Sequence, residues 1–193
     1  LSIAKSWSFY GDEFPSHAEP LAQRDRRLAR HPQTIFLLIH LANHPEDLEY
    51  VDRLLDTHKN VWVDTSARVP EFGRHPPEKV RALFTKHQDR ILFGSDFVSA
   101  PRGMQLGSAW HVPTEDPTLE DAVRFFQLHW PYFEGTGKQI EHPTPIQGAW
   151  KVDGIGQPEP VLRKLYRTNA QKLIFVPLAP LSARHPAWPH LSK

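Results

Sequence analysis

The 193-residue chain is long enough to bury one core, but it has no cysteine, so disulfides and thiolate-bound metals are excluded. Its formal net charge is +1, which gives no electrostatic reason to expect binding to nucleic acid or to an anionic membrane. The 12 histidines and the carboxylates are the groups that could hold a metal, and no apolar run reaches the length of a membrane span.

The chain begins without an initiator methionine and without the apolar stretch of a signal peptide, so we expect a chain cut or processed upstream of Leu1. We expect a cytoplasmic protein. Residues 7–10 predict a short aromatic strand. Ser16, followed three residues later by Glu19, predicts the start of a polar helix that runs to about Ala29.

Residues 34–39 form the most apolar run of the chain, and their lack of alternation predicts a strand buried on both faces, as in a parallel sheet. The run ends at His40. A histidine at the end of a buried strand is a candidate metal ligand or general base. The alternative is a core histidine whose ring nitrogens hydrogen-bond to the backbone.

A second strand is predicted at residues 61–66, after a helix over residues 46–57 whose apolar side chains recur at helical spacing. Asp64 and Ser66 lie at the carboxyl end of this strand. The second strand therefore ends in polar groups, as the first does.

A third helix, opened by Pro76 and Pro77 and ending near His87, leads to an apolar strand at residues 91–93. Asp96 follows this strand after a glycine and a serine. A carboxylate just past the end of a buried parallel strand lies where α/β folds place their chemistry. The alternative is that Asp96 only caps the following turn.

The order strand, helix, strand, helix, strand predicts an α/β fold with parallel strands. All three strands would present polar residues at one edge, which are His40, Asp64, Ser66, Ser95 and Asp96. This shared edge is the predicted functional site.

The chain beyond the third strand is less regular. Residues 97–113 predict a long loop, in which His111 would line the wall of a pocket. A helix is predicted over residues 118–130, an irregular segment over 135–156, and a last helix over 158–174.

Two motifs stand out, Ile-Leu-Phe-Gly-Ser-Asp, which ends at Asp96, and Tyr-x-x-Asn-Ala, which ends at Ala170. With several shorter stretches, they resemble the amidohydrolase-related family, also called amidohydrolase 2, of metal-dependent TIM-barrel hydrolases and decarboxylases. The first motif is the most specific. The other matching stretches are residues 7–11, 23–25, 30–32, 36–41, 60–64, 66–68, 72–74, 88–90, 148–150 and 161–166.

The resemblance implies the carboxyl-terminal part of a (β/α)8 barrel, with the three strands as its sixth, seventh and eighth. It implies that Asp96 binds a divalent metal and shuttles a proton, while His40 positions or polarises the attacking water or the substrate. We expect both residues to be metal ligands and Zn2+ to be the ion. The implied activity is hydrolysis of a C–N or C–O bond in a small molecule by a metal-activated water.

Two other functions stay open. One is a non-oxidative decarboxylase, a lyase, on the same scaffold, in which Arg68 or Arg74 grips a substrate carboxylate. The other role of these arginines is an ion pair in the loop with Glu71. The second alternative is a non-catalytic fragment or binding module.

The chain also departs from the family, because it has no counterpart of the His-x-His pair on the family's first strand or of the histidine on its fifth. Three strands cannot close a barrel. We therefore expect an incomplete barrel domain over residues 1–176, followed by a proline-rich tail over 177–193. A second copy or the missing amino-terminal half would complete the sheet.

Overall fold

The computed structural model describes residues 14–101, 103–107, 117–144 and 150–175. Its centre is a parallel three-stranded sheet in the order β1 (Phe36–Leu38), β2 (Val61–Asp64) and β3 (Ile91–Leu92). In the register of the sheet, Phe36 pairs with Val61, and Val63 pairs with Ile91. The structure is therefore mixed α/β, and its parallel sheet is consistent with part of a TIM-like fold.

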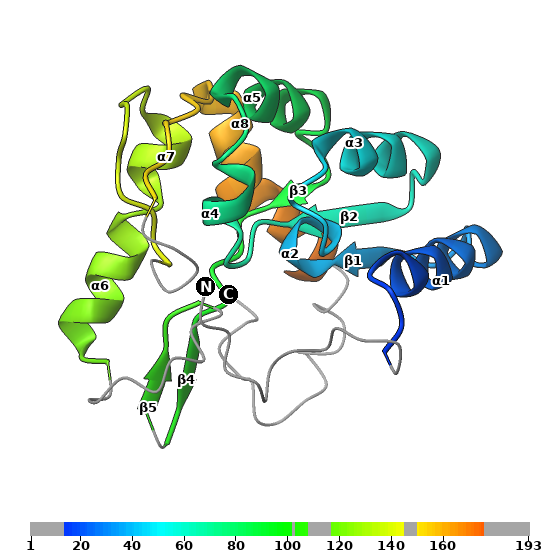
Figure 1. Ribbon diagram of the computed structural model, residues 1–193, viewed down its shortest axis with the longest axis horizontal. Helices are drawn as coiled ribbons and strands as arrows, with labels where there is room; N and C mark the ends of the chain where they lie inside the picture. The colour runs from blue at the N-terminus through cyan, green and yellow to red at the C-terminus, as the bar shows by residue number, and fades with distance from the viewer. Residues whose placement is uncertain (1–13, 102, 108–116, 145–149, 176–193) are drawn as a thin grey trace.

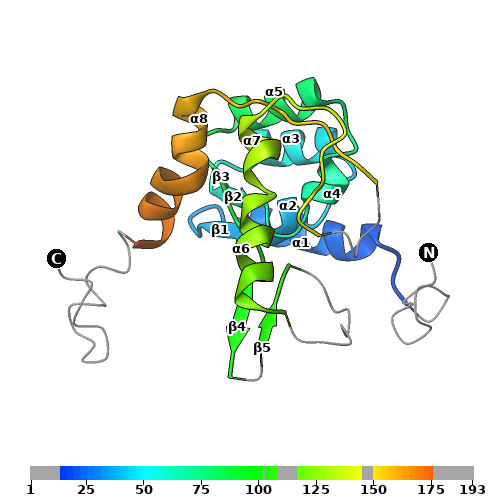
Figure 2. The ribbon, with the colours of Figure 1, turned by 90° about the vertical axis from the view of Figure 1, so that its left-hand side faces the viewer.

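Short helices and one hairpin surround the sheet. The helices are α1 (Ala18–Arg30), α2 (Ile39–Ala42), α3 (Leu48–Thr57), α4 (Val69–Phe72), α5 (Pro77–Lys86), α6 (Leu119–Gln127), α7 (Trp130–Glu134) and α8 (Glu159–Arg163), with two π-helical turns, η3 (Lys164–Thr168) and η4 (Gln171–Phe175). The hairpin pairs β4 (Val98–Ala100) with β5 (Gly103–Gln105). It projects away from the layer formed by α3 and α5 (Figures 1 and 2). In the part that the structure describes, no helix is both long and apolar enough to cross a bilayer.

Helices α3 and α5 pack on one face of the sheet and bury the main core (Figure 1). Helix α3 begins where the Asp47 side chain accepts a hydrogen bond from the Tyr50 N–H at 2.8 Å, which satisfies one of the unpaired amides of its first turn. Apolar residues at helical spacing then face the strands. The buried side chains of this layer include Val51, Leu55, Val61, Val63, Val80, Phe84 and Ile91.

The carboxyl-terminal helical segment closes the β3 side of the sheet. The backbone N–H of Phe93 donates to the carbonyl oxygen of Leu165 at 2.8 Å. The buried Asn169 side chain donates from Nδ2 to the carbonyl oxygens of Gln88 (2.8 Å) and Ile91 (2.7 Å). Asn169 therefore pairs backbone groups that a strand at the end of the sheet would otherwise leave open.

The first strand differs from its prediction, because it is shorter and is buried on one face only. The side chains of Ile35, Leu37 and Ile39 are 62%, 37% and 52% exposed, whereas Phe36 and Leu38 pack against the core. The reason is that β1 lies at the end of the described sheet, where only one face meets the helix layer. Apolar and polar residues do not alternate in this strand because both of its faces carry apolar side chains. Only one of the two faces is buried.

Two more boundaries differ from prediction. The predicted loop over residues 97–113 contains the β4–β5 hairpin, and the predicted helix over 118–130 is divided between α6 and α7. Pro131 explains the division, because a proline inside a helix removes a hydrogen bond and its ring clashes with the preceding turn. The predicted capping of α6 is confirmed, since Thr118 and Asp121 form a reciprocal capping box. The predicted strand at residues 7–10 and the tail over 177–193 lie outside the described residues.

Candidate functional site

Because the three strands run parallel, their carboxyl ends meet at one edge of the sheet. We call the residues that follow these ends the strand-end rim, which consists of His40 after β1, Thr65 and Ser66 after β2, and residues 93–96 after β3, together with Asp64 at the end of β2. Polar groups from all three strands therefore leave the sheet at the same edge, as the order of elements predicted.

Asp64 is the centre of the hydrogen bonding at this rim. Its side chain is buried, with the residue 9% exposed. Its Oδ1 accepts from the backbone N–H of His40 (2.8 Å) and of Ser66 (3.1 Å), and its Oδ2 accepts from Ser66 Oγ (2.8 Å). A buried carboxylate is costly unless donors surround it, and here three donors do. Asp64 therefore ties the end of β1 to the end of β2.

The ring of His40 is fixed by the same part of β2. Its Nδ1 lies 2.8 Å from the carbonyl oxygen of Ser66. A carbonyl oxygen can only accept, so Nδ1 carries a proton, and the tautomer that this bond selects has its lone pair on Nε2. A backbone carbonyl that holds one ring nitrogen is the usual support of a histidine that binds a metal through the other nitrogen.

His40 also opens an unusual stretch of backbone. His40, Leu41, Ala42 and Asn43 have φ angles of 58°, 50°, 57° and 52°, so four consecutive non-glycine residues are left-handed, and the short segment labelled α2 is a left-handed turn and not a right-handed helix. Each such residue costs about 1–2 kcal/mol relative to right-handed backbone, so the surroundings must hold the turn in place. Leu41 and Ala42 are fully buried, which anchors its middle. No residue type in residues 40–43 predicted this turn, since none of them is a glycine.

The end of β3 is pressed closely against the end of β2. The Thr65 hydroxyl donates to the carbonyl oxygen of Gly94 and accepts from its N–H, both at 3.0 Å. A Cβ atom on Gly94 would lie 2.2 Å from Ser66 Oγ and 3.0 Å from Asp64 Oδ2. Asp96 comes two residues later, with a φ of 60°. His40 and the segment that carries Asp96 thus flank the β2 end from its two sides.

The two predicted arginines lie beyond the end of β2, on either side of α4. Arg68 Nη1 is 3.6 Å from Glu71 Oε1, so the ion pair predicted as its alternative role is present. Burial raises the pKa of Glu71 above its usual 4.5, and the Arg68 charge opposes that rise. The guanidinium of Arg74 stacks over the Trp150 ring at 5.1 Å. His111 lies outside the described residues.

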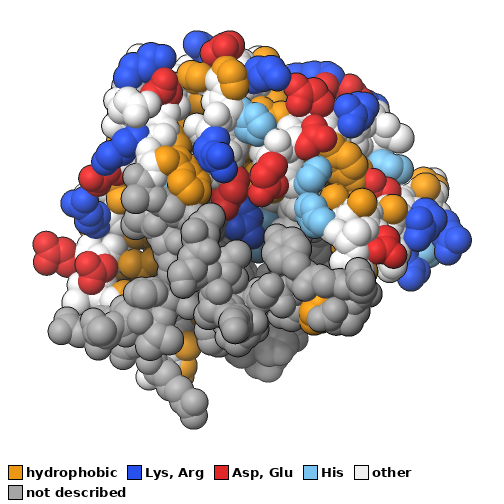
Figure 3. Space-filling model, in the orientation of Figure 1, with side chains coloured by type: hydrophobic (Ala, Val, Ile, Leu, Met, Phe, Trp, Pro, Cys, Tyr) orange, Lys and Arg blue, Asp and Glu red, His pale blue; other side chains and the backbone are white. Residues whose placement is uncertain are grey.

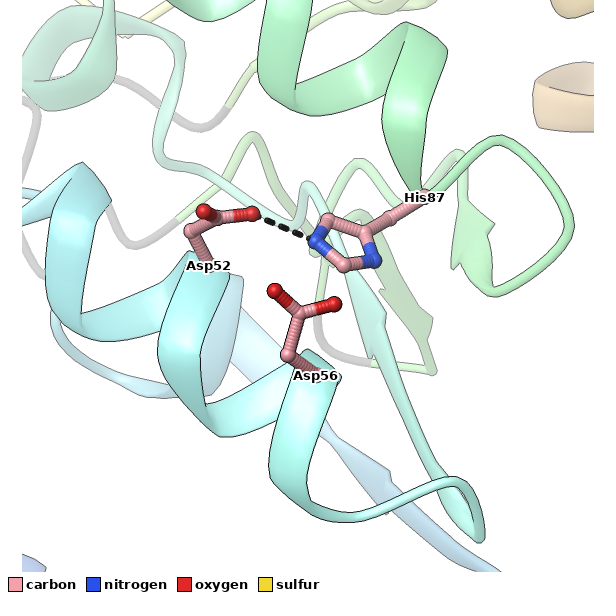
Figure 4. A group of neighbouring side chains, drawn as sticks. All are labelled: Asp52, Asp56 and His87. Carbon is pink, nitrogen blue, oxygen red and sulfur yellow. Dashed lines mark hydrogen bonds and ion pairs between the residues drawn. The ribbon is translucent and has the colours of Figure 1, made fainter.

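A second cluster, which the sequence analysis missed, joins the carboxyl ends of α3 and α5 (Figure 4). Asp52, Asp56 and His87 place ligand atoms within 4.8 Å of one another, and His87 Nε2 is 2.6 Å from Asp52 Oδ1. Its sequence signal is the spacing of four residues between the two aspartates on one helix face. These helix ends precede β2 and β3, so the cluster lies at the opposite edge of the sheet from the strand-end rim.

The ammonium group of Lys86 already lies beside both aspartates of that cluster. Lys86 Nζ lies 2.7 Å from Asp52 and 2.6 Å from Asp56. Burial lowers the pKa of His87, and the neighbouring Asp52 opposes the shift. The group is therefore complete as an ion-pair network between two helices. Lys, Arg, Asp and Glu side chains also intermingle over α3 and α5 on the face shown in Figure 3.

The sequence was compared with family models, curated proteins and solved structures. The family model described as Amidohydrolase matches residues 7–176 of the chain. Neither the comparison with curated proteins nor that with solved structures gave a significant match.

Proposed function

The chain belongs to the amidohydrolase family, and we propose that it takes part in metal-dependent hydrolysis of a C–N or C–O bond in a small molecule, with His40 and Asp96 as its site residues. The observation that carries the proposal is the hydrogen bond between His40 Nδ1 and the Ser66 carbonyl oxygen. It leaves the lone pair of the neutral ring on Nε2, where a metal ligand or a proton acceptor needs it.

The donor atoms at the strand-end rim suit a zinc ion. Imidazole nitrogen and carboxylate oxygen are both common zinc ligands, and His40 and Asp96 would supply one of each. A catalytic zinc takes three protein ligands and keeps one position open. The remaining ligand would come from outside the described residues, and a second copy or an amino-terminal half of the barrel is the partner that we propose for it.

A divalent cation at this rim supplies Lewis acidity, so that a water can lose its proton near neutral pH. In the proposed reaction, the water oxygen forms a bond to the substrate carbon, and the bond from that carbon to nitrogen or oxygen breaks. Asp96 accepts the proton of the water and returns it to the leaving nitrogen or oxygen. Asp64 and Ser66 hold His40 so that its Nε2 keeps one direction, either as a metal ligand or toward the water or the substrate.

A second candidate is non-oxidative decarboxylation, which the position of Arg74 favours. Its guanidinium is oriented by the Trp150 ring, whose Nε1 donates to the carbonyl oxygen of Pro70 in α4, the helix that follows the β2 end. A guanidinium held in one orientation is preorganised to bind a carboxylate through two hydrogen bonds. Arg68 is the weaker choice for this role because it already pairs with Glu71.

The test compares three forms of the 193-residue chain, which are the wild type, Asp96→Asn and Asp56→Asn. Zinc content is measured after dialysis, and turnover is measured on amides, lactones and esters, with carbon dioxide release from carboxylic acids followed in parallel. If a second copy of the chain supplies the remaining ligand, we expect about one zinc per site and hydrolysis in the wild type and in Asp56→Asn, and loss of both in Asp96→Asn.

Asp56→Asn is the matched control, because it alters the acidic cluster between α3 and α5 without touching the strand-end rim. Loss of zinc in Asp56→Asn but not in Asp96→Asn would place the cation in the helical cluster and overturn the proposal. A wild-type chain that neither binds zinc nor turns over any substrate would favour a non-catalytic module. Carbon dioxide release without hydrolysis would favour the decarboxylase.

A further inference from the structure

The left-handed turn that begins at His40 is held from a second side, by helix α1. Arg24 of α1 donates from Nη1 to the carbonyl oxygen of Ala42, within the turn. The Arg24 side chain is 19% exposed, so its guanidinium is largely withdrawn from water. Asp64 of β2 therefore binds the first residue of the turn, and Arg24 of α1 binds the third.

The guanidinium of Arg24 is itself fixed by two further side chains. Its Nη2 donates to Tyr50 OH at 2.6 Å, and its Nε and Nη2 contact Asp25 Oδ1 at 3.1 and 3.0 Å. Tyr50 OH donates in turn to Asp25 Oδ2. Asp47, which caps α3, bonds to the backbone N–H of Tyr50, so the tyrosine is anchored on a helix of the core.

The chemistry of this network requires a guanidinium. One nitrogen must reach the Ala42 carbonyl oxygen while another reaches the phenol and the carboxylate, and a planar group with donors in a fixed fork does this without rotating. Burial, together with hydrogen bonding to Asp25, raises the pKa of Tyr50 to about 12, so the phenol keeps its proton and remains a donor.

We propose that Arg24 is a positioning residue of the hydrolytic site, which fixes the left-handed turn and thereby the direction in which His40 presents Nε2. The effect of Arg24 on catalysis rests on the proposed function. Its effect on the turn rests only on the contacts of Arg24 described above. Arg24 touches no reacting group, so it acts only through the turn. Without it, the backbone between His40 and Asn43 relaxes toward right-handed conformations, and the ring of His40 loses its fixed hydrogen bond to Ser66.

The experiment compares Arg24→Ala and Arg24→Lys with Arg27→Ala in the full 193-residue chain. Arg27 is the control, because it lies on the same helix, is exposed, and has His31, at 3.4 Å, as its side-chain partner among the described residues. With histidine labelled by 15N, NMR reports the protonated Nδ1 of His40, and His40→Gln assigns its signal. Circular dichroism and thermal melting establish that each variant is folded.

We expect the Nδ1–H signal of His40 to be lost or averaged with solvent in Arg24→Ala, to be only partly restored in Arg24→Lys, and to be unchanged in Arg27→Ala. Where turnover is measurable, kcat falls about 10-fold to 100-fold in Arg24→Ala with KM nearly unchanged, because a misdirected group lowers the rate more than the binding. An unchanged His40 signal in folded Arg24→Ala would overturn the proposal.

The experiment also distinguishes a variant that does not fold and a chain that has no activity. If Arg24→Ala does not fold, Tyr50→Phe replaces it, since this change removes one hydroxyl that holds the guanidinium and keeps the half-buried ring. An unchanged His40 signal in Tyr50→Phe then overturns the proposal, and a weakened signal supports it. If no form of the chain turns over substrate, the proposed function fails, but the His40 signal still decides whether Arg24 holds the turn.

Discussion

Gly94 lies so close to Ser66 that a Cβ atom on residue 94 would stand 2.2 Å from Ser66 Oγ. The hydroxyl cannot simply move aside, because it donates to Asp64 Oδ2 at 2.8 Å. The absence of a side chain at Gly94 is therefore what allows the ends of β2 and β3 to meet, and with them the segments that carry the proposed site residues.

Gly94→Ala tests this contact. The added methyl group forces Ser66 or the backbone to shift, and overpacking of this kind costs about 1–3 kcal/mol. Urea denaturation should show that decrease in the free energy of unfolding. Gly137→Ala is the control, because among the described residues its Cβ would meet one flexible side-chain atom, Ile140 Cγ2, at 3.1 Å. Equal stability of the two variants would mean that the β2 and β3 ends have room to separate.

Asn169 gives a second prediction, at the side of β3. Its Nδ2 donates to the carbonyl oxygens of Gln88 and Ile91, and the residue is 3% exposed. Asn169→Ala leaves both acceptors without this partner, at a cost of about 1–3 kcal/mol. Asn169→Asp should be worse, because a carboxylate oxygen would face two carbonyl oxygens.

Denaturation of both variants, with the exposed Gln171→Ala as the control, gives the comparison. The order of stability is expected to be control, alanine variant, aspartate variant. If the aspartate variant were as stable as the wild type, the amide could not be the group that binds these carbonyls.

The elements that the sequence predicted best are those whose patterns are local. The helix over residues 46–57 and the β2 strand follow from apolar spacing, and the capping of α6 follows from Thr118 and Asp121 three residues apart. The strand-end rim also follows from local order, since parallel strands in sequence must end at one edge. The Tyr-x-x-Asn-Ala motif likewise contains Asn169, which now has a structural role at β3.

What the sequence could not provide depends on contacts between distant residues. His40 meets Asp64 across 24 positions, and Arg24 meets Ala42 across 18, and no spacing rule links them. The left-handed turn was invisible because its conformation is imposed by those contacts and not by glycine. The exposure of Leu37 was missed for a similar reason, since an apolar run alone does not say how many faces of a strand are covered.

The last prediction concerns pH and His129, a buried histidine between α6 and α7. The residue is 1% exposed, and its Nδ1 donates to the carbonyl oxygen of Phe125 at 2.9 Å. Burial lowers its pKa from 6.5 to about 4, although that carbonyl opposes the shift. The unfolded chain therefore binds a proton between these two values that the folded chain does not. Folding stability should be fully present above pH 6.5 and should fall as the pH drops toward 4, by on the order of 3 kcal/mol.

Denaturation at a series of pH values between 4 and 7 would measure this effect as the difference between the wild type and His129→Gln. The variant loses the titrating group, so its stability should fall less steeply over this range, whatever its stability at pH 7. His87 titrates in the same direction in both proteins and cancels in the difference. The exposed His31→Gln serves as the control and should keep the wild-type slope. Parallel curves for the wild type and His129→Gln would mean that the ring gains its proton without opening the contact between α6 and α7.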